Sequence, residues 1–585
     1  MSSIVKQDQI LLKGIPASPG IAIGPVFLYR KQAPQIQEKT ISPAEADQEV
    51  ERLNEAMARS QKELRKILEF AQSKLGDQQA RIFEAQLMIL EDDVLLQSIL
   101  RRVREELKNV EFVVENEIGK YHRMMLAAQD EYTRERAHDV EDVKNRILRN
   151  LQQEKLVSRL DGSYIIASHS LAAADTLIFS RNDVLGYAME VGGVTSHSAL
   201  LARALKIPMV VGLRDITTRL QHGDVMIVDG HNGMVIINPT DESIDEYEKR
   251  RERYREFQQR LQVLRDLPAE TLDGRRIQLA ANIELEEELD SLHLRGGDGI
   301  GLFRSETLLL GKEVFPSEDE QYEQYKRLVD AVYPKPVIIR TFDIGGDKMM
   351  VHAGKENNPF LGWRGIRVML AKEELFLDQL RAILRASSRK NVMMMFPMVS
   401  HIKEVREAKA LVEVAKRDLR EHNIPYDEEI KIGIMVEVPS AAVIADDLAR
   451  EVSFLSIGTN DLIQYLLAVD RTNDIVSDLY QEFHPAVIRF LRRIIERGRS
   501  KNVWVGMCGE MAGDPLATVL LVGLGLDEFS VVPSVLPEIK KIIRSIRYEE
   551  AKNVAHHVLS LQTEDEIKGY LKEYMREKFP EIPIE

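Results

Sequence analysis

The C-terminal half of the chain alternates short apolar segments with helical segments, and this alternation constrains the fold more than any other feature. Eight of the apolar segments are predicted as strands, and they span 277–283, 299–304, 337–342, 392–399, 432–438, 454–458, 504–508 and 528–531. Eight strands that alternate with helices over about 300 residues are typical of a (β/α)8 barrel. The sequence therefore predicts a TIM barrel within residues 269–585.

Functional side chains of such a barrel stand at the C-terminal ends of its strands. Polar or reactive residues lie at or just after five of the predicted strand ends: Arg304, Arg340, Glu437, Asn460 with Asp461, and Cys508. Glu437 and Asp461 are a pair of hard carboxylates that suits Mg²⁺. Four arginines would bring cationic forks to the same rim: Arg304, Arg340, Arg364 and Arg471. Such forks suit a small ligand that carries both phosphate and carboxylate groups.

Each of these residues alone has a simpler interpretation. An isolated arginine or glutamate at a strand end is more often a salt-bridge partner, and a lone cysteine is most often a small core residue. Their gathering on one predicted rim favours function. For Cys508, the flanking glycines Gly506 and Gly509 and the strand-end position favour a reactive thiol that faces the pocket.

In the N-terminal half, residues 192–203 read Gly-Gly-Val-Thr-Ser-His-Ser-Ala-Leu-Leu-Ala-Arg. Thr195 and Ser196 are good N-cap residues, so His197 is expected in the first turn of a helix. Free backbone N–H groups and the positive helix end favour a neutral imidazole there and accept a phosphate beside it. The sequence thus indicates a phosphate-accepting histidine. The alternative is a glycine turn before an ordinary helix, with His197 as a surface or capping residue.

Helical patterning runs from about residue 42 to 151. A capping box at Ser42 and Glu45 opens it, with Pro43 at the first helical position. Gly76 is expected to end the first helix, and a second run places Phe83, Leu87, Leu90 and Val94 on one face. Residues 14–29 and 164–238 have instead short apolar segments with Gly and Pro.

These two sequence patterns predict an α/β phosphohistidine domain formed by residues 1–30 and 152–239, interrupted by a helical subdomain at 31–151. A highly charged helix at 247–264 is expected within a solvated linker, 240–268, that leads to the barrel. A length of 585 residues likewise predicts several domains.

The formal net charge of −15 argues against a general nucleic-acid binder and suits basic protein partners. One cysteine excludes an internal disulfide framework and fits a reducing compartment. The N-terminal stretch lacks the apolar core of a signal peptide, and the apolar run at 516–526 is too short to span a bilayer. A cytoplasmic protein without membrane insertion is expected.

Six sequence blocks occur in a specific order along the chain. They are residues 17–22 (ASPGIA), the Thr195-Ser196-His197 block, 301–306 (GLFRSE), 340–348 (RTFDIGGDK), 358–364 (NPFLGWR) and 506–510 (GMCGE). In this order the blocks resemble the enzyme I family of the bacterial sugar phosphotransferase system, within the phosphoenolpyruvate-utilising enzymes. The resemblance covers essentially the whole chain.

The resemblance implies transfer of a phosphoryl group from phosphoenolpyruvate to Nε2 of His197, and then to a histidine of the small phosphocarrier protein HPr. It implies that Glu437 and Asp461 bind Mg²⁺ and that Cys508 protonates the enolate carbon to give pyruvate. The implied contacts to the substrate are Arg304, Arg340, Asn460, Asp461 and Arg471, with Arg364 as a further wall contact. The helical insert at 83–95 would dock the carrier, and the barrel would form a homodimer.

Other assignments remain open at this stage. Pyruvate phosphate dikinase and phosphoenolpyruvate synthase share the phosphohistidine and barrel modules, but they need an ATP-binding domain, and no glycine-rich nucleotide loop is visible. A nitrogen-branch enzyme I would have the same chemistry with another carrier, but its extra sensory domain is not seen. A catalytically idle regulatory homologue would lack part of the site. Two positions depart from the family pattern: Val194, often Arg, and Gln86, often His.

Overall fold

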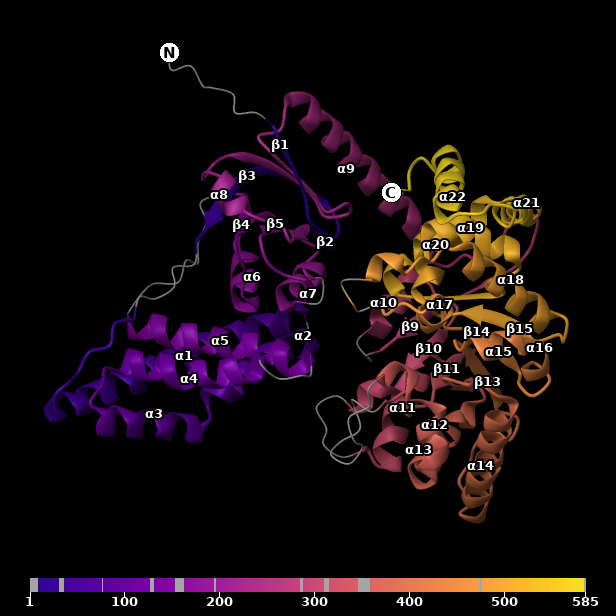
Figure 1. Ribbon diagram of the computed structural model, residues 1–585, viewed down its shortest axis with the longest axis horizontal. Helices are drawn as coiled ribbons and strands as arrows, with labels where there is room; N and C mark the ends of the chain where they lie inside the picture. The colour runs from indigo at the N-terminus through magenta and orange to yellow at the C-terminus, as the bar shows by residue number, and fades with distance from the viewer. Residues whose placement is uncertain are drawn as a thin grey trace. The chain divides into compact units, whose positions relative to one another are not determined.

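The structure is a computed structural model, and two compact units make up the chain (Figure 1). Unit 1 is Met1–Tyr254 and unit 2 is Arg255–Glu585. The residues described are 9–30, 36–75, 77–126, 131–152, 162–193, 196–284, 288–309, 315–345, 358–471, 473 and 476–582. Each unit is considered by itself.

Unit 2 contains a closed barrel of eight parallel strands, as the sequence predicts. The strands are β9 (Gln278–Ile283), β10 (Ile300–Arg304), β11 (Val337–Arg340), β12 (Val392–Phe396), β13 (Lys431–Val436), β14 (Phe454–Ile457), β15 (Trp504–Met507) and β16 (Glu528–Val531). The barrel closes where β16 pairs with β9. The observed β12 ends earlier than the predicted segment, and Met398 just beyond it has a positive φ of 56°.

Helices surround these strands (Figure 1). They are α10 (Glu288–Arg295), α11 (Glu318–Val332), α12 (Ile366–Ala371), α13 (Glu373–Ala386), α14 (Ile402–Glu421), α15 (Pro439–Val443), α16 (Ala445–Leu448), α17 (Thr459–Leu467), α18 (Pro485–Arg499), α19 (Pro515–Leu524), α20 (Leu536–Ser545), α21 (Tyr548–Val558) and α22 (Glu564–Lys578). The apolar run at 516–526 is α19, buried in this unit rather than in a bilayer.

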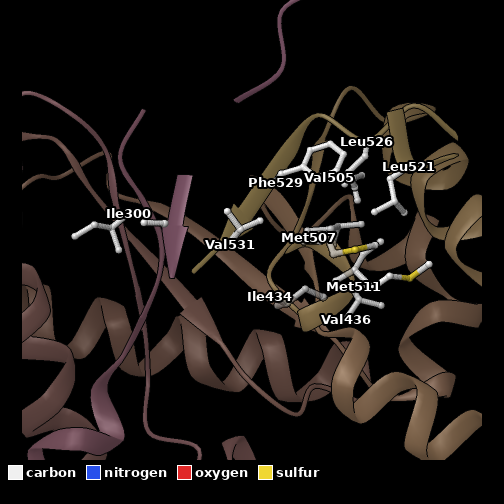
Figure 2. Close-up of a cluster of buried hydrophobic side chains, with 14 of the residues drawn as sticks. Ile300, Ile434, Val436, Val505, Met507, Met511, Leu521, Leu526, Phe529 and Val531 are labelled. Atoms are coloured by element: carbon white, nitrogen blue, oxygen red, sulfur yellow. The ribbon is translucent and has the colours of Figure 1, made fainter. Parts of the chain in front are cut away.

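Alternation along the strands divides the apolar side chains of the barrel between two cores. Met507 of β15 and Phe529 and Val531 of β16 belong to the outer core, where they meet residues such as Leu521 of α19 (Figure 2). The inner cluster of the barrel contains Leu302, Ile338, Met395, Met435, Phe454 and Cys508. Successive residues of one strand therefore serve different cores.

Unit 1 contains an eight-stranded sheet of order β1-β8-β7-β3-β4-β5-β6-β2. Its strands are β1 (Ile10–Lys13), β2 (Ile15–Ser18), β3 (Ile21–Tyr29), β4 (Tyr164–Ser168), β5 (Val184–Met189), β6 (Met209–Val211), β7 (Val225–Asp229) and β8 (Met234–Ile237). β3 and β4 are direct parallel neighbours, with Val26 opposite Ile165. All helices between these two strands are therefore an insertion into the α/β sheet.

The inserted helices are α1 (Pro43–Leu75), α2 (Asp77–Leu90), α3 (Asp93–Glu106), α4 (Val110–Leu126) and α5 (Glu131–Leu151). At the start of α1 the Glu45 carboxylate accepts bonds from both the N–H and the hydroxyl of Ser42. The expected Gly76 stop lies outside the described residues. The predicted apolar face from Phe83 to Val94 is wrong at its end, because Asp92 caps a new helix and Val94 is 77% exposed.

The shorter helices of unit 1 are α6 (Ala173–Phe179), α7 (His197–Ala204) and α8 (Ile216–Arg219). Within this unit, α6 and α7 lie between the sheet and the inserted helices (Figure 1), and Leu177 and Leu201 belong to the core of the insert. The start of α7 is thereby brought next to α2 and α5.

The predicted charged helix is α9 (Asp241–Gln262), which begins six residues before the predicted start. Near its middle, Arg250 forms an ion pair of 3.4 Å with the buried Asp229 of β7, and Tyr254 packs on His231. Its last turns instead bury Phe257 and Leu261 in the outer core of the barrel. Among the helices that the structure describes, none combines the length and apolar character needed to cross a membrane.

Candidate active site

His197 is the first residue of α7, as the sequence predicts. Ser196 is the N-cap, and its Oγ accepts a bond of 3.3 Å from the N–H of Ala199. This cap leaves the imidazole in the first helical turn, where the backbone N–H groups of a helix N-terminus favour an anion. Thr195 and Val194, the other predicted elements of this motif, lie outside the described residues.

The imidazole of His197 faces a buried carboxylate from the inserted helices. Asp139 of α5 places its Oδ1 3.5 Å from His197 Nδ1, and Asp139 is 1% exposed. Gln86 of α2 donates from Nε2 to the same Oδ1 over 3.1 Å. Gln86 is fully buried, so it cannot meet a docking protein directly. Its side chain instead contacts Asp139, the carboxylate that faces His197.

The strand ends of the barrel carry the predicted residues at one mouth. Arg304 and Arg340 are the last residues of β10 and β11, and Glu437 and Cys508 directly follow β13 and β15. Asn460 and Asp461 occupy the first turn of α17, directly after β14. Because parallel strands end together, these side chains come from neighbouring strands around one rim.

Asp343 joins two of the arginines at this rim. Its Oδ2 lies 3.3 Å from a terminal nitrogen of Arg340 and 2.8 Å from one of Arg364. Glu306 forms a second ion pair with Arg340 at 3.0 Å, and it accepts the Asp343 N–H. Burial lowers the pKa of Arg340, but the adjacent carboxylates outweigh this effect and hold it above its usual value. Both cations are therefore fixed in place before any ligand arrives.

Arg364 also reaches the first turn of α17. Its two terminal nitrogens lie 3.3 and 3.4 Å from the Asp461 carboxylate. The hydroxyl of Tyr465 accepts a third contact at 3.2 Å and donates to the carbonyl of Phe360. Arg364 thus links two carboxylates, Asp343 and Asp461, which come from different strand ends.

Glu437 is the most deeply buried carboxylate of the rim, at 1% exposed. Its Oε1 accepts the N–H of Met398 at 2.5 Å, and the positive φ of Met398 aims that N–H at the site. Its Oε2 lies against Gly458, where an added Cβ would approach to 3.0 Å. Burial, together with the charges of Asp461 and Asp343, raises the pKa of Glu437 to about 8.

These features fit a hard divalent cation. Glu437 and Asp461 are mutually repelling oxygen ligands, and a cation between them would offset their charge. No cluster of three or more His, Cys, Asp or Glu ligands is found among the described residues. A cation that takes one or two carboxylates and completes its shell with water and substrate oxygens matches this donor set.

Glu510 contacts two further predicted residues of the rim, Asn460 and Arg471. Its Oε1 accepts from Asn460 Nδ2 at 2.8 Å and lies 3.1 Å from Arg471. The amide is held from its other end, because Asn460 Oδ1 accepts the Glu510 N–H at 2.9 Å. The fourth predicted arginine of the rim, Arg304, forms an ion pair with Glu284.

Cys508 faces the inner cluster of the barrel and is 3% exposed. Its Sγ lies 3.7 Å from the carbonyl of Ile457, and its N–H donates to the same oxygen at 3.0 Å. Burial raises the pKa of the thiol to about 11. The group is therefore a protonated thiol at neutral pH, suited to give a proton and not to act as a thiolate nucleophile.

Three family models match the chain in order. They are the N-terminal domain of PEP-utilising enzymes at residues 13–136, the mobile domain at 160–233 and the PEP-binding domain at 258–548. The phosphoenolpyruvate-protein phosphotransferase of Staphylococcus carnosus is 41% identical over 97% of this chain and 99% of its own length. The chain belongs to the phosphoenolpyruvate-protein phosphotransferase family.

A second relative matches nearly the whole chain, and a solved structure matches part of it. The phosphoenolpyruvate-protein phosphotransferase of Bacillus subtilis is 42% identical and covers 96% of this chain and 99% of its own. A solution NMR structure described as Enzyme I (nEIt) is 39% identical over 42% of this chain and 99% of its own, with a TM-score of 0.38.

Sequence reasoning did not single out five side chains that contact the candidate residues: Asp139, Glu306, Asp343, Tyr465 and Glu510. Glu306, Asp343 and Glu510 stand two or three residues beyond the ends of β10, β11 and β15, so the strand-end rule applied to the following turn would have found them. Asp139 stands inside a helix of another subdomain and has no comparable local signal.

Proposed function

We propose that the chain transfers the phosphoryl group of phosphoenolpyruvate to Nε2 of His197 and from there to a histidine of the phosphocarrier HPr, releasing pyruvate as the first step of sugar uptake. The observation that carries this proposal is the convergence of paired arginines and carboxylates on one barrel mouth. Relatives about 40% identical over nearly the whole chain carry the matching name.

In unit 1, Asp139 accounts for the choice of nitrogen on His197. A carboxylate beside Nδ1 favours the tautomer that carries its proton there, which places the nucleophilic lone pair on Nε2. The N-terminus of α7 supplies N–H groups that stabilise the negative charge of the incoming phosphoryl group.

At the barrel mouth, the substrate's phosphate and carboxylate would be held by cationic forks and amides. The residues proposed for this role are Arg304, Arg340, Arg364, Asn460 and Arg471, and the resemblance adds Asp461 as a further residue of the substrate site. Because Asp343 and Glu306 hold Arg340 and Arg364 in fixed directions, little ordering remains to be done when the substrate binds.

Glu437 and Asp461 are proposed as the ligands of Mg²⁺. When bound, the cation would offset negative charge on the transferring phosphoryl group. The two carboxylates follow the neighbouring strands β13 and β14, and the Met398 N–H holds Glu437 in place.

Cys508 is proposed as the acid that completes the reaction. After the phosphoryl group leaves, the enolate C2=C3 electrons take the Sγ proton at C3, and the C2–O bond becomes the ketone. The thiolate that remains regains a proton from water. A thiol with a pKa of about 11 holds its proton until this carbon nucleophile forms.

The insert at 83–95 is proposed to dock HPr. Met88 on α2 and Val94 on α3 are 71% and 77% exposed, and exposed apolar side chains of this kind favour a protein partner. A homodimer through the barrel is proposed from the resemblance alone. A cytoplasmic location is proposed from the single cysteine, which fits a reducing compartment.

The test incubates the purified chain with phosphoenolpyruvate labelled at phosphorus, Mg²⁺ and HPr. We expect acid-labile, base-stable label on the chain, its passage to HPr and release of pyruvate. His197→Ala should keep its fold and lose all label, because it removes the nucleophile. Label that persists in this variant would reject His197. Label that reaches only a nitrogen-branch carrier would move the chain to that branch.

A further inference from the structure

The peptide unit of Cys508 lies just beyond the last backbone pairing between β15 and β16. β15 pairs with β16 at two positions only, Gly506 opposite Glu528 and Met507 opposite Phe529. On its other side, the N–H of Cys508 still donates to Ile457 of β14. The carbonyl of Cys508 has instead a side-chain partner: Asn282 donates to it from Nδ2 over 3.0 Å.

Asn282 reaches this carbonyl past one intervening strand. It belongs to β9, and β16 lies between β9 and β15 in the strand order. The neighbours of Asn282 on its own strand, Ala281 and Ile283, belong to the outer core, so alternation turns Asn282 toward the inside. The same alternation applies to Cys508 beside the outward-facing Met507 in Figure 2.

The side-chain amide of Asn282 is itself oriented by a hydrogen bond to its oxygen. Ser530 of β16 donates from Oγ to Asn282 Oδ1 over 2.6 Å, and Ser530 is 1% exposed. Phe529 and Val531 on either side of Ser530 face outward in Figure 2. Because Oδ1 is taken by a hydroxyl donor, the NH₂ group must point toward Cys508. One chain of bonds therefore runs from β16 through β9 to the peptide that carries the thiol.

We propose that Asn282, oriented by Ser530, is a positioning residue that sets the direction of the Cys508 thiol during protonation of the enolate. The inference rests on the proposed role of Cys508 as the acid. Both residues act through the Cys508 backbone. Without the amide, the buried carbonyl loses its partner and the peptide unit can rotate.

The expected effect is confined to one chemical step. Phosphoryl transfer to His197 uses the arginines and carboxylates of the rim, which Asn282 does not contact in the described structure. Proton transfer from Sγ to C3 depends on a near-linear approach, and a misplacement of about 1 Å is enough to slow a step of this kind by up to ~10²-fold. Changing Asn282 should therefore separate the two steps.

The test uses the full chain with phosphoenolpyruvate, Mg²⁺ and HPr, in single-turnover and steady-state experiments. Asn282→Leu keeps the side-chain shape and removes the bond, Asn282→Ala is the second variant, and Ser530→Ala leaves the amide but frees its far end. Asn391→Leu is the matched control, because buried Asn391 also donates from Nδ2 to a backbone carbonyl, that of Lys335, at the opposite ends of the strands.

Two readouts are compared. One is the ratio of the rate of His197 phosphorylation to the rate of pyruvate formation. The other is the stereochemical purity of the pyruvate methyl group made in D₂O from phosphoenolpyruvate labelled stereospecifically at C3. A merely structural residue would not alter which face of the enolate receives the proton.

For Asn282→Leu we expect pyruvate formation to slow about tenfold, phosphorylation to slow less than about threefold, and the methyl group to lose stereochemical purity. Ser530→Ala should fall between this variant and the parent, and Asn391→Leu should match the parent in both readouts. Equal loss of both steps, or unchanged stereochemistry in both Asn282 variants, would overturn the inference. Unchanged stereochemistry in Cys508→Ala would instead reject Cys508 as the acid.

Discussion

Asp139 Oδ1 lies 3.5 Å from His197 Nδ1, so a carboxylate of the inserted helices faces the proposed phosphate acceptor of the α/β sheet. Gln86, from a second inserted helix, holds that carboxylate. We therefore propose that the insert takes part in the chemistry of His197 in addition to docking a carrier.

Asp139→Asn should slow phosphoryl transfer to and from His197 by roughly 10- to 100-fold, because an amide can present an N–H to Nδ1 and favour the wrong tautomer. The rate of exchange between labelled HPr and the chain measures this. Glu141→Gln on the same helix is the control, since Glu141 pairs with His122 over 3.6 Å. Equal rates in the two variants would mean that Asp139 is structural.

A cut inside α9 and a cut just after it should give barrel fragments of different stability. The fragment 255–585 keeps Phe257 and Leu261, which are 2% and 4% exposed, whereas 265–585 loses both. Loss of a buried Phe or Leu side chain costs about 2–5 kcal/mol, so the shorter fragment should unfold at lower urea. Fluorescence of Trp363 and Trp504, the two tryptophans of the chain and both in unit 2, reports this.

The same cuts test the division of labour between the units. The fragment 1–254 should exchange phosphate with phosphorylated HPr and remain unlabelled by phosphoenolpyruvate, because it carries His197 without the barrel mouth. Direct labelling of this fragment by phosphoenolpyruvate would contradict the proposed roles.

Stability of the barrel should fall with rising pH because of Glu528. This side chain is 1% exposed, and within the described residues neither carboxyl oxygen has a hydrogen-bond partner. Burial, with a contribution from Asp298, raises its pKa to about 8. Its ordinary pKa is about 4.3, so the folded state keeps a proton that the unfolded state loses between these values.

The favourable contribution of protonated Glu528 is therefore complete below about pH 4.3 and is lost as pH rises toward 8, at up to ~1.4 kcal/mol per pH unit. Glu528→Gln should remove this dependence, so its urea midpoint relative to the parent should rise between pH 5.5 and 7.5. Tryptophan fluorescence again follows unit 2. A constant difference between the two proteins would show that Glu528 is ionised in the fold.

Glu510→Gln should lower the KM for phosphoenolpyruvate about two- to fivefold and leave kcat nearly unchanged. The Glu510 carboxylate competes with the substrate for Arg471 at 3.1 Å, and an exposed ion pair of this kind is worth about 1 kcal/mol or less. A glutamine keeps an oxygen for Asn460 while removing the charge. An increase in KM would indicate that Glu510 orders the site instead.

Glu437→Gln and Asp461→Asn should each abolish Mg²⁺-dependent turnover, because an amide cannot offset the charge of the cation. Steady-state rates over a Mg²⁺ titration test this, and removal of the metal by chelation should stop the parent in the same way. Glu451→Gln, at a carboxylate that pairs with Arg406 outside the proposed metal and substrate sites, is the control. Normal turnover of either site variant at low Mg²⁺ would relocate the metal.

Much of the fold follows from local sequence patterns. All eight barrel strands were predicted, as was the place of His197 in the first turn of α7, because apolar periodicity and N-cap residues act over a few neighbouring positions. The strand-end positions of Arg340, Glu437 and Cys508 followed from the strands themselves. The end of a helix at Leu90 was not predicted, although Asp92 is a good N-cap for the next helix. The apolar spacing continues from Leu90 to Val94, so the two helices were read as one.

The contacts that orient the reactive groups depend on tertiary structure. Asp139 meets His197 only because the insert packs on α7, and Asn282 meets Cys508 only because the barrel closes β16 against β9. The amino-acid sequence by itself determined which side chains stand at helix starts and strand ends, since these are properties of short segments. Strand order, register and packing decided which of them touch, because such contacts join residues whose separation along the chain leaves no local pattern.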